Sequence, residues 1–171
     1  WHPYSGITFS NTGGYKRFIG IPYSLDKLEI PSFMEFWKKF NEFNFDRNKS
    51  LEIAINRFNY AMEREKPEDK IIDFMISLEA LFLKGTEDEL SYRLSIRMAT
   101  FLGVTKEEKQ KIFSDIKKGY KLRSKVVHGN SKINPEDFSE IGLIEDYARQ
   151  SIKKFMDLLK NKTHNEIIKE V

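Results

Sequence analysis

The segment PEDKIIDFMISLEALFLKG, residues 67–85, carries the hydrophobic pattern that decides the fold. Its apolar residues return every three or four positions, at Ile71, Phe74, Met75, Leu78 and Phe82. That period is typical of an α-helix with one face in a core. Pro67 suits the first turn of a helix, and Gly85 suits its end. The sequence therefore predicts a core-facing helix between these two residues.

Five further segments show the same helical period. Their apolar stripes are Phe33, Phe36, Trp37, Phe40 and Phe43; Leu51, Ala54, Ile55, Phe58 and Met62; Leu90, Leu94, Met98 and Phe101; Ile112, Phe113, Ile116 and Tyr120; and Phe138, Ile141, Ile144, Ala148, Ile152, Phe155 and Leu159. No segment after Ser32 alternates as a strand would. We expect an all-α protein, an antiparallel bundle of five to six helices whose sequence neighbours pack together.

Residue pairs three positions apart mark where several of these helices should begin. Ser32 with Glu35, Thr86 with Glu89, and Thr105 with Glu108 have the spacing of a capping box. Asn134 followed by Pro135 predicts the start of the last long helix. Gly103 and Gly129 are expected to end the fourth and fifth helices.

The composition changes near residue 31. Residues 1–31 hold three of the five prolines and short aromatic clusters, which is loop or short-strand chemistry. We expect residues 1–31 to be an irregular segment, the tail of an upstream region. Residues 32–160 are then the helical bundle, and residues 161–171 a C-terminal tail.

The chain has no cysteine, which excludes disulfides and thiolate metal sites and fits a reducing compartment. We expect a cytoplasmic protein. Its three histidines are scattered and show no metal-ligand spacing, so we expect neither a metal nor another cofactor. No apolar run approaches the roughly 20 residues that a bilayer requires, so we expect no membrane association.

Basic residues are concentrated in one short stretch. Six of the 29 lysines and arginines lie between Lys117 and Lys132, a stretch without acidic residues. The remaining residues are mildly acidic, with 23 basic against 26 acidic side chains. A basic patch on an acidic body is a candidate polyanion site, although such runs are more often solvated helix faces.

Three charged residues fall on apolar faces of their helices. On a helical wheel, Arg123 lies within the arc of the fifth helix's apolar side chains. Glu79 and Arg97 fall among apolar positions of the third and fourth helices. Because a buried charge needs a partner, two arrangements are open. Glu79 pairs with Arg97 and leaves Arg123 for a ligand, or Glu79 pairs with Arg123 and all three are structural.

His128 lies in the last turn before Gly129. A histidine there could act in general acid–base catalysis. It could instead bond to the final carbonyls of the helix, which is the commoner role. On a regular helix, His128 and Arg123 are about 140° apart, so one straight face cannot hold both.

The motif RSKVVHG (123–129) has the R-x-x-x-x-H form of the HEPN superfamily. Its surroundings resemble the Apea-like HEPN branch over most of residues 50–130, in the segments LEIAINRFNYAMER (51–64), IIDFMISLEALFL (71–83), ELSYRLSIRMATFLG (89–103) and YKLRSKVVHG (120–129). The residue after the motif arginine, often Asn, Asp or His in active HEPN enzymes, is Ser124 here.

This resemblance implies a bundle that dimerises through the motif helices. It also implies a metal-independent endoribonuclease, of a kind found in phage-defence, toxin–antitoxin and RNA-processing systems. By position, Arg123, Ser124 and His128 are then the expected catalytic residues, with Lys121, Lys125 and Tyr120 contacting RNA. An antitoxin or an upstream effector domain is a further expected partner.

Two functions follow from the resemblance. The first is a homodimeric endoribonuclease with a composite site, in which Arg123 of one chain works with His128 of the other. The second is a non-catalytic module that binds RNA or a nucleotide, or pairs chains for a larger effector protein. We favour the first.

Overall fold

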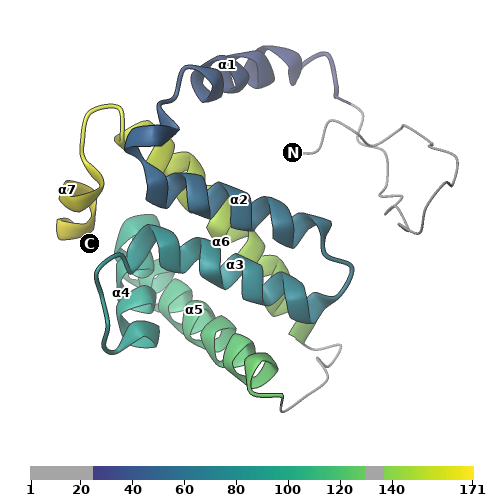
Figure 1. Ribbon diagram of the computed structural model, residues 1–171, viewed down its shortest axis with the longest axis vertical. Helices are drawn as coiled ribbons and strands as arrows, with labels where there is room; N and C mark the ends of the chain where they lie inside the picture. The colour runs from purple at the N-terminus through teal and green to yellow at the C-terminus, as the bar shows by residue number, and fades with distance from the viewer. Residues whose placement is uncertain (1–24, 130–136) are drawn as a thin grey trace, which may run out of the picture. The chain divides into compact units, whose positions relative to one another are not determined.

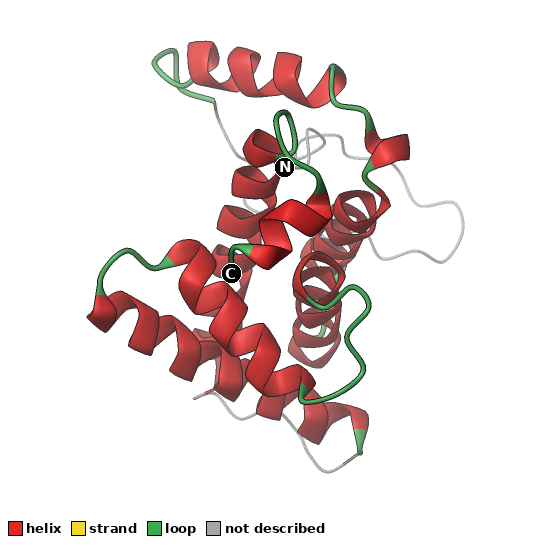
Figure 2. Ribbon diagram, turned by 90° about the vertical axis from the view of Figure 1, so that its left-hand side faces the viewer, coloured by secondary structure: helices red, strands yellow, loops and turns green. Residues whose placement is uncertain are grey.

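The computed structural model describes residues 25–129 and 137–171, and this part of the chain is helical, without strands (Figures 1 and 2). Its elements are α1 (Ile30–Asn41), the 3₁₀ helix η1 (Phe45–Arg47), α2 (Lys49–Glu63), α3 (Pro67–Phe82), α4 (Leu90–Leu102), α5 (Lys106–Val127), α6 (Asp137–Leu158) and α7 (His164–Lys169). The prediction of an all-α bundle is confirmed.

The chain divides into two units, residues 1–44 and 45–171. The predicted boundary at residue 31 therefore lies before that division, because α1 belongs to the first unit. Helix α1 begins at Ile30, with Glu29 at the N-cap position and without a side-chain cap. The predicted Ser32–Glu35 capping box is wrong, because Ser32 already lies inside the first turn.

Aromatic rings line one side of α1. The rings of Phe33 and Trp37 stack at 6.2 Å, and those of Trp37 and Phe40 stack at 6.0 Å. Spacings of three and four residues place these side chains one above another on a helix. Four of the five predicted stripe residues therefore lie on α1, Phe43 follows its end, and no α1 residue is buried.

In the second unit, α3 is the central helix, and α2, α4, α5 and α6 all pack against it. Figure 1 shows α2 alongside α3 and α4 alongside α5, the pairing of sequence neighbours that short connections predict. Half of α3 is buried: Ile71, Asp73, Phe74, Met75, Ser77, Leu78, Leu81 and Phe82. The core-facing helix predicted within residues 67–85 is thus the centre of the core.

An aromatic cluster joins the helices at one end of the core. Phe155 of α6 lies 5.3 Å from Phe82 of α3 and 4.8 Å from Phe101 of α4, centroid to centroid. His164 of α7 stacks on Phe155 at 5.6 Å, and its Nε2 lies 2.7 Å from the carbonyl oxygen of Leu81. Burial lowers the pKa of His164, which favours the neutral imidazole.

Helix α7 lies in the segment that we expected to be a tail. Thr163 and Glu166 form a capping box at its start, and Ile167 is buried. The assignment of residues 161–171 to a tail is therefore corrected: α7 is a docked part of the bundle. The predicted start of the last long helix at Asn134–Pro135 lies outside the described residues.

The two remaining capping predictions had different outcomes. Thr105 and Glu108 form the predicted capping box at the start of α5. Glu89, by contrast, is the N-cap of α4 in a left-handed conformation (φ 53°), and no side-chain bond caps that helix. The Thr86–Glu89 prediction is wrong, because the Thr86 hydroxyl accepts a hydrogen bond from Arg97 instead.

Candidate functional site

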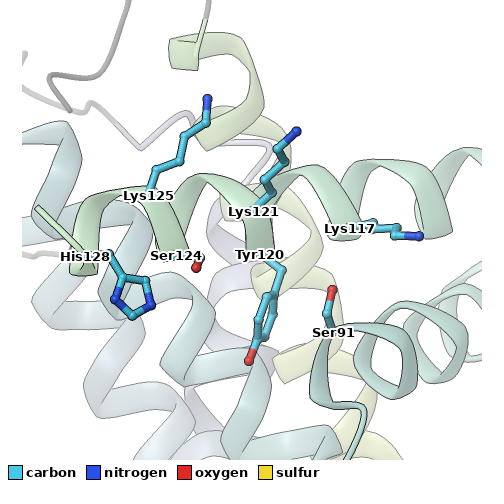
Figure 3. Close-up of a pocket in the computed structure, with 7 residues that line it drawn as sticks. All are labelled: Ser91, Lys117, Tyr120, Lys121, Ser124, Lys125 and His128. Carbon is cyan, nitrogen blue, oxygen red and sulfur yellow. The ribbon is translucent and has the colours of Figure 1, made fainter. Parts of the chain in front are cut away.

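One face of α5 and the first turn of α4 form an open pocket of about 530 Å³ (Figure 3). The described residues that line it are Ser91, Lys117, Tyr120, Lys121, Ser124, Lys125 and His128. Six of the seven come from α5 or its C-cap, at spacings of three and four residues that make side chains neighbours along a helix. Five residues of the predicted site, Tyr120, Lys121, Ser124, Lys125 and His128, are therefore brought together.

The pocket is positively charged. Three of its lining residues are lysines, and none of the described lining residues is acidic. In Figure 3, Tyr120 and His128 project from one side of α5, with Ser91 of α4 beside Tyr120. Lys121 and Lys125 extend from the other side of the helix. Hydroxyl, imidazole and ammonium groups around one hollow form a site suited to an anion.

His128 is the C-cap residue of α5. Its backbone N–H donates to the carbonyl of Ser124 at 3.1 Å, and Gly129 follows with φ +71°. The imidazole itself is exposed and forms no hydrogen bond with any described residue. The backbone of His128, and not its ring, therefore completes the helix end, which leaves both ring nitrogens available in the pocket.

Arg123 does not line this pocket. Its guanidinium carbon lies 5.9 Å from the centroid of the Tyr120 ring. Its Nε is buried and has no hydrogen-bond partner among the described residues. Within one chain, the structure therefore does not place Arg123 and His128 in the same pocket. Their separation agrees with the angle of about 140° expected on one helix.

Glu79 of α3 lies within reach of the charge of Arg123. Burial raises the pKa of Glu79, and the positive charge of Arg123 opposes that rise. Oε1 of Glu79 is buried without a hydrogen-bond partner, and Glu79 forms no ion pair within the described chain. Burial also raises the pKa of Tyr120, with a further rise from Glu79 and an opposing effect of Arg123. Glu79, Arg123 and Tyr120 thus form one electrostatically linked cluster, of which Tyr120 lines the pocket.

Arg97 has other partners. Its Nη1 donates to the carbonyl of Phe82 and, at 3.2 Å, to the hydroxyl of Thr86. Burial lowers its pKa, and the charge of Arg93 lowers it further. Of the two arrangements left open by the sequence, the Glu79–Arg97 ion pair is absent from the described residues. Arg97 instead fastens the α3–α4 connection to α4.

Sequence reasoning missed a second set of inward charges. Asp73 of α3 is 3% exposed and accepts hydrogen bonds from two arginines of the α2 region. Arg57 Nη1 lies 3.0 Å from one carboxylate oxygen, and Arg64 Nε lies 2.9 Å from the other. The signal was present, because Asp73 interrupts the apolar run IIDFM in residues 71–75.

Two kinds of feature are absent from the described residues, a membrane-spanning helix and a cluster of metal-ligating side chains. No helix within residues 25–129 and 137–171 combines the length and apolar character that crossing a bilayer requires. The same residues contain no group of three or more His, Cys, Asp or Glu side chains that could hold a metal ion.

In comparisons with known proteins, no family model, curated protein or solved structure matches the chain.

Proposed function

We propose that this chain is a metal-independent endoribonuclease of the HEPN type, acting on RNA at the α5 pocket. The observation that supports it is that His128, Ser124, Tyr120 and three lysines line one pocket along α5. RNA supplies a phosphodiester for the lysines and a nucleophile, the 2′-hydroxyl, for a proton-accepting imidazole. The pocket thus offers a charge and a proton carrier where that chemistry needs both.

The reaction needs two proton transfers and stabilisation of negative charge. The 2′-oxygen attacks the adjacent phosphorus as its proton is removed, and the bond from phosphorus to the 5′-oxygen breaks. A proton delivered to that 5′-oxygen completes the reaction, which leaves a 2′,3′-cyclic phosphate and a 5′-hydroxyl. His128 performs one of these transfers, since its ring nitrogens are unoccupied. Lys121 and Lys125 hold flanking phosphates without reading sequence.

A two-fold dimer would supply the second proton carrier and the arginine. An isologous interface brings both copies of each residue to one cleft. Arg123 of one copy then faces the phosphodiester held beside His128 of the other copy. Its forked N–H donors suit the two non-bridging oxygens, whose charge increases in the transition state. This arrangement accounts for Arg123 and His128 lying on different faces of α5.

The test is cleavage of single-stranded RNA in the presence of EDTA. Wild-type protein should release fragments ending in a 2′,3′-cyclic phosphate. His128→Ala should lower the rate by about 100-fold or more, because a positioned acid or base contributes that much. Lys153→Ala, at an exposed α6 lysine that does not line the pocket, is the matched control.

The result is interpretable only if the variant stays folded. Thermal unfolding and gel filtration of His128→Ala should therefore match wild type. Undiminished cleavage by folded His128→Ala would eliminate the catalytic role of this residue.

A non-catalytic module that binds RNA or a nucleotide, or pairs chains for an effector, is the second candidate. It is favoured by the position of Arg123 outside the pocket and by Ser124 after the motif arginine. If it is correct, neither wild type nor His128→Ala produces fragments. Arg123→Ala then weakens a salt-sensitive interaction with RNA, since such binding depends on neutralising phosphates.

A further inference from the structure

An aromatic pair, with one exposed and one half-buried ring, lies next to the α5 pocket, on the side away from His128. Tyr92 of α4 and Phe113 of α5 meet edge to face, with centroids 5.8 Å apart. Tyr92 remains 54% exposed although it contacts Phe113. Exposure of a single ring is common, so it is the place of this ring, beside a positively charged pocket, that makes it a candidate contact for a ligand.

The aromatic pair is continuous with the pocket through two neighbours. Ser91, which lines the pocket, directly precedes Tyr92 on α4. Lys117, which also lines the pocket, holds its ammonium 5.9 Å from the centroid of Phe113. Along α5, Phe113, Lys117, Lys121, Ser124 and His128 follow one another at spacings of three and four residues. One stripe therefore runs from an aromatic ring, past lysines, to a histidine.

Aromatic rings next to a basic groove are the pattern used to bind single-stranded nucleic acid. The lysines follow the phosphates, and the rings stack on bases that a duplex would keep paired. On an α-helix, Phe113 lies roughly 10 Å along the axis from Tyr120 in the pocket. A phosphate in the pocket and a base on the aromatic pair therefore belong to different nucleotides of one strand.

We infer that Tyr92 and Phe113 form a base-stacking subsite for single-stranded RNA whose phosphates occupy the α5 pocket. This inference rests on the proposed function, because RNA is the ligand assigned to that pocket. It adds a substrate class, unpaired RNA, and two binding residues. The subsite contacts a nucleotide away from the scissile bond, so its loss affects affinity and leaves the chemical step intact.

The test measures affinity separately from cleavage. The probe is a fluorescent single-stranded oligonucleotide with 2′-O-methyl groups, which cannot be cut because the 2′-hydroxyl nucleophile is blocked. The same probe annealed to its complement serves as the duplex comparison. In fluorescence anisotropy with the full chain, Tyr92→Ala should weaken single-strand binding by roughly 5- to 100-fold, the range of one base–aromatic stack. Duplex binding should stay unchanged.

Two further variants separate stacking from general effects. Tyr92→Phe keeps the ring and should bind the single strand as wild type does. Tyr60→Ala removes a tyrosine of α2 that is similarly exposed, at 50%, and should also bind normally. Thermal unfolding of Tyr92→Ala checks that loss of the contact with Phe113 leaves the bundle folded.

The outcomes distinguish this inference from the proposed function. If Lys121→Gln and Lys125→Gln weaken binding while folded Tyr92→Ala does not, the subsite is refuted and the RNA pocket stands. If wild type binds neither probe, or binds poly-glutamate equally well, both the subsite and the RNA pocket are refuted. If Tyr92→Ala weakens binding but wild type cuts no RNA, the subsite stands and the endoribonuclease proposal falls.

Discussion

Two acidic residues of α3, Asp73 and Glu79, point into the bundle and have opposite surroundings. Both oxygens of Asp73 accept hydrogen bonds, one from Arg57 and one from Arg64. Glu79 has a buried oxygen without a partner and faces Arg123, whose Nε is also buried and unpartnered within the described residues. The Asp73 carboxylate is saturated, in that each of its oxygens accepts a hydrogen bond, whereas the Glu79 carboxylate has an oxygen that accepts none.

The two charged clusters, Asp73 with Arg57 and Arg64, and Glu79 with Arg123, therefore have different roles. The side chains of Arg57 and Arg64 are 40% and 49% exposed, so their charges stay hydrated while they neutralise Asp73. Such a cluster joins α2 to α3 and needs nothing further. Arg123 has no equivalent neutralising contact, and it lies over Tyr120, which lines the pocket. An arginine kept without full pairing retains its donors for another acceptor, which is the role proposed for it in a dimer.

The largest effect is expected at the saturated cluster. Asp73→Asn removes the charge that two arginines contact and should lower the free energy of unfolding by about 2–4 kcal/mol, since hydrogen bonds to charged groups are the strong ones. Urea denaturation measures this change. Asp146→Asn, at an exposed α6 residue, is the control and should stay within about 0.5 kcal/mol. A similarly small loss for Asp73→Asn would show that the cluster is not structural.

A pair of double-mutant cycles compares the two clusters directly. Asp73→Asn with Arg57→Met should give a coupling free energy of about 1 kcal/mol, as expected for residues in contact. Glu79→Gln with Arg123→Met should give about 0.5 kcal/mol or less, because no bond joins that pair. Equal couplings in the two cycles would remove the distinction between a saturated and an unsaturated cluster.

The smallest effect is a change in the pH dependence of stability. Burial raises the pKa of Glu79 above its ordinary value of 4.5, so the folded state binds a proton that the unfolded state releases. The contribution of Glu79 to stability is therefore fully present below pH 4.5 and is lost as pH rises through the raised folded pKa. Glu79→Gln should remove this decline, so its stability relative to wild type should increase with pH.

Urea titrations of both proteins between pH 4 and pH 8 would measure this difference. Glu52→Gln, at a half-exposed carboxylate on α2, is a suitable comparison. If the stability of wild type relative to Glu79→Gln instead rises with pH, the charge of Arg123 lowers the pKa of Glu79 more than burial raises it. Glu79 and Arg123 would then form an effective ion pair, contrary to the proposed availability of Arg123.

Capping signals show where local reasoning succeeded and where it failed. Thr105–Glu108 and Thr86–Glu89 have the same spacing, yet only the first forms a capping box. At Thr105 both hydrogen bonds join neighbours in sequence. At Thr86 the hydroxyl instead accepts from Arg97, a residue on the following helix. A local motif therefore predicts structure only where no distant donor competes for it.

The candidate site divides in the same way. The motif resemblance, and not helical spacing, grouped Tyr120, Lys121, Ser124, Lys125 and His128 with Arg123, and the first five of these line one pocket. Helical spacing placed Arg123 on another face. The spacing along α5 could not indicate Ser91 or Tyr92, because these residues belong to α4 and lie beside α5 only after the two helices pack.

By itself, the sequence determined the helical class, the core face of α3 and the stripe along α5, because a period of 3.6 residues is a local property. Tertiary structure alone decided the partners of the inward charges and the docking of α7, whose His164 bonds to Leu81, 83 positions away in sequence. Helical periodicity fixes the direction of a side chain from its own axis. The atoms that it meets depend on how the helices pack against one another.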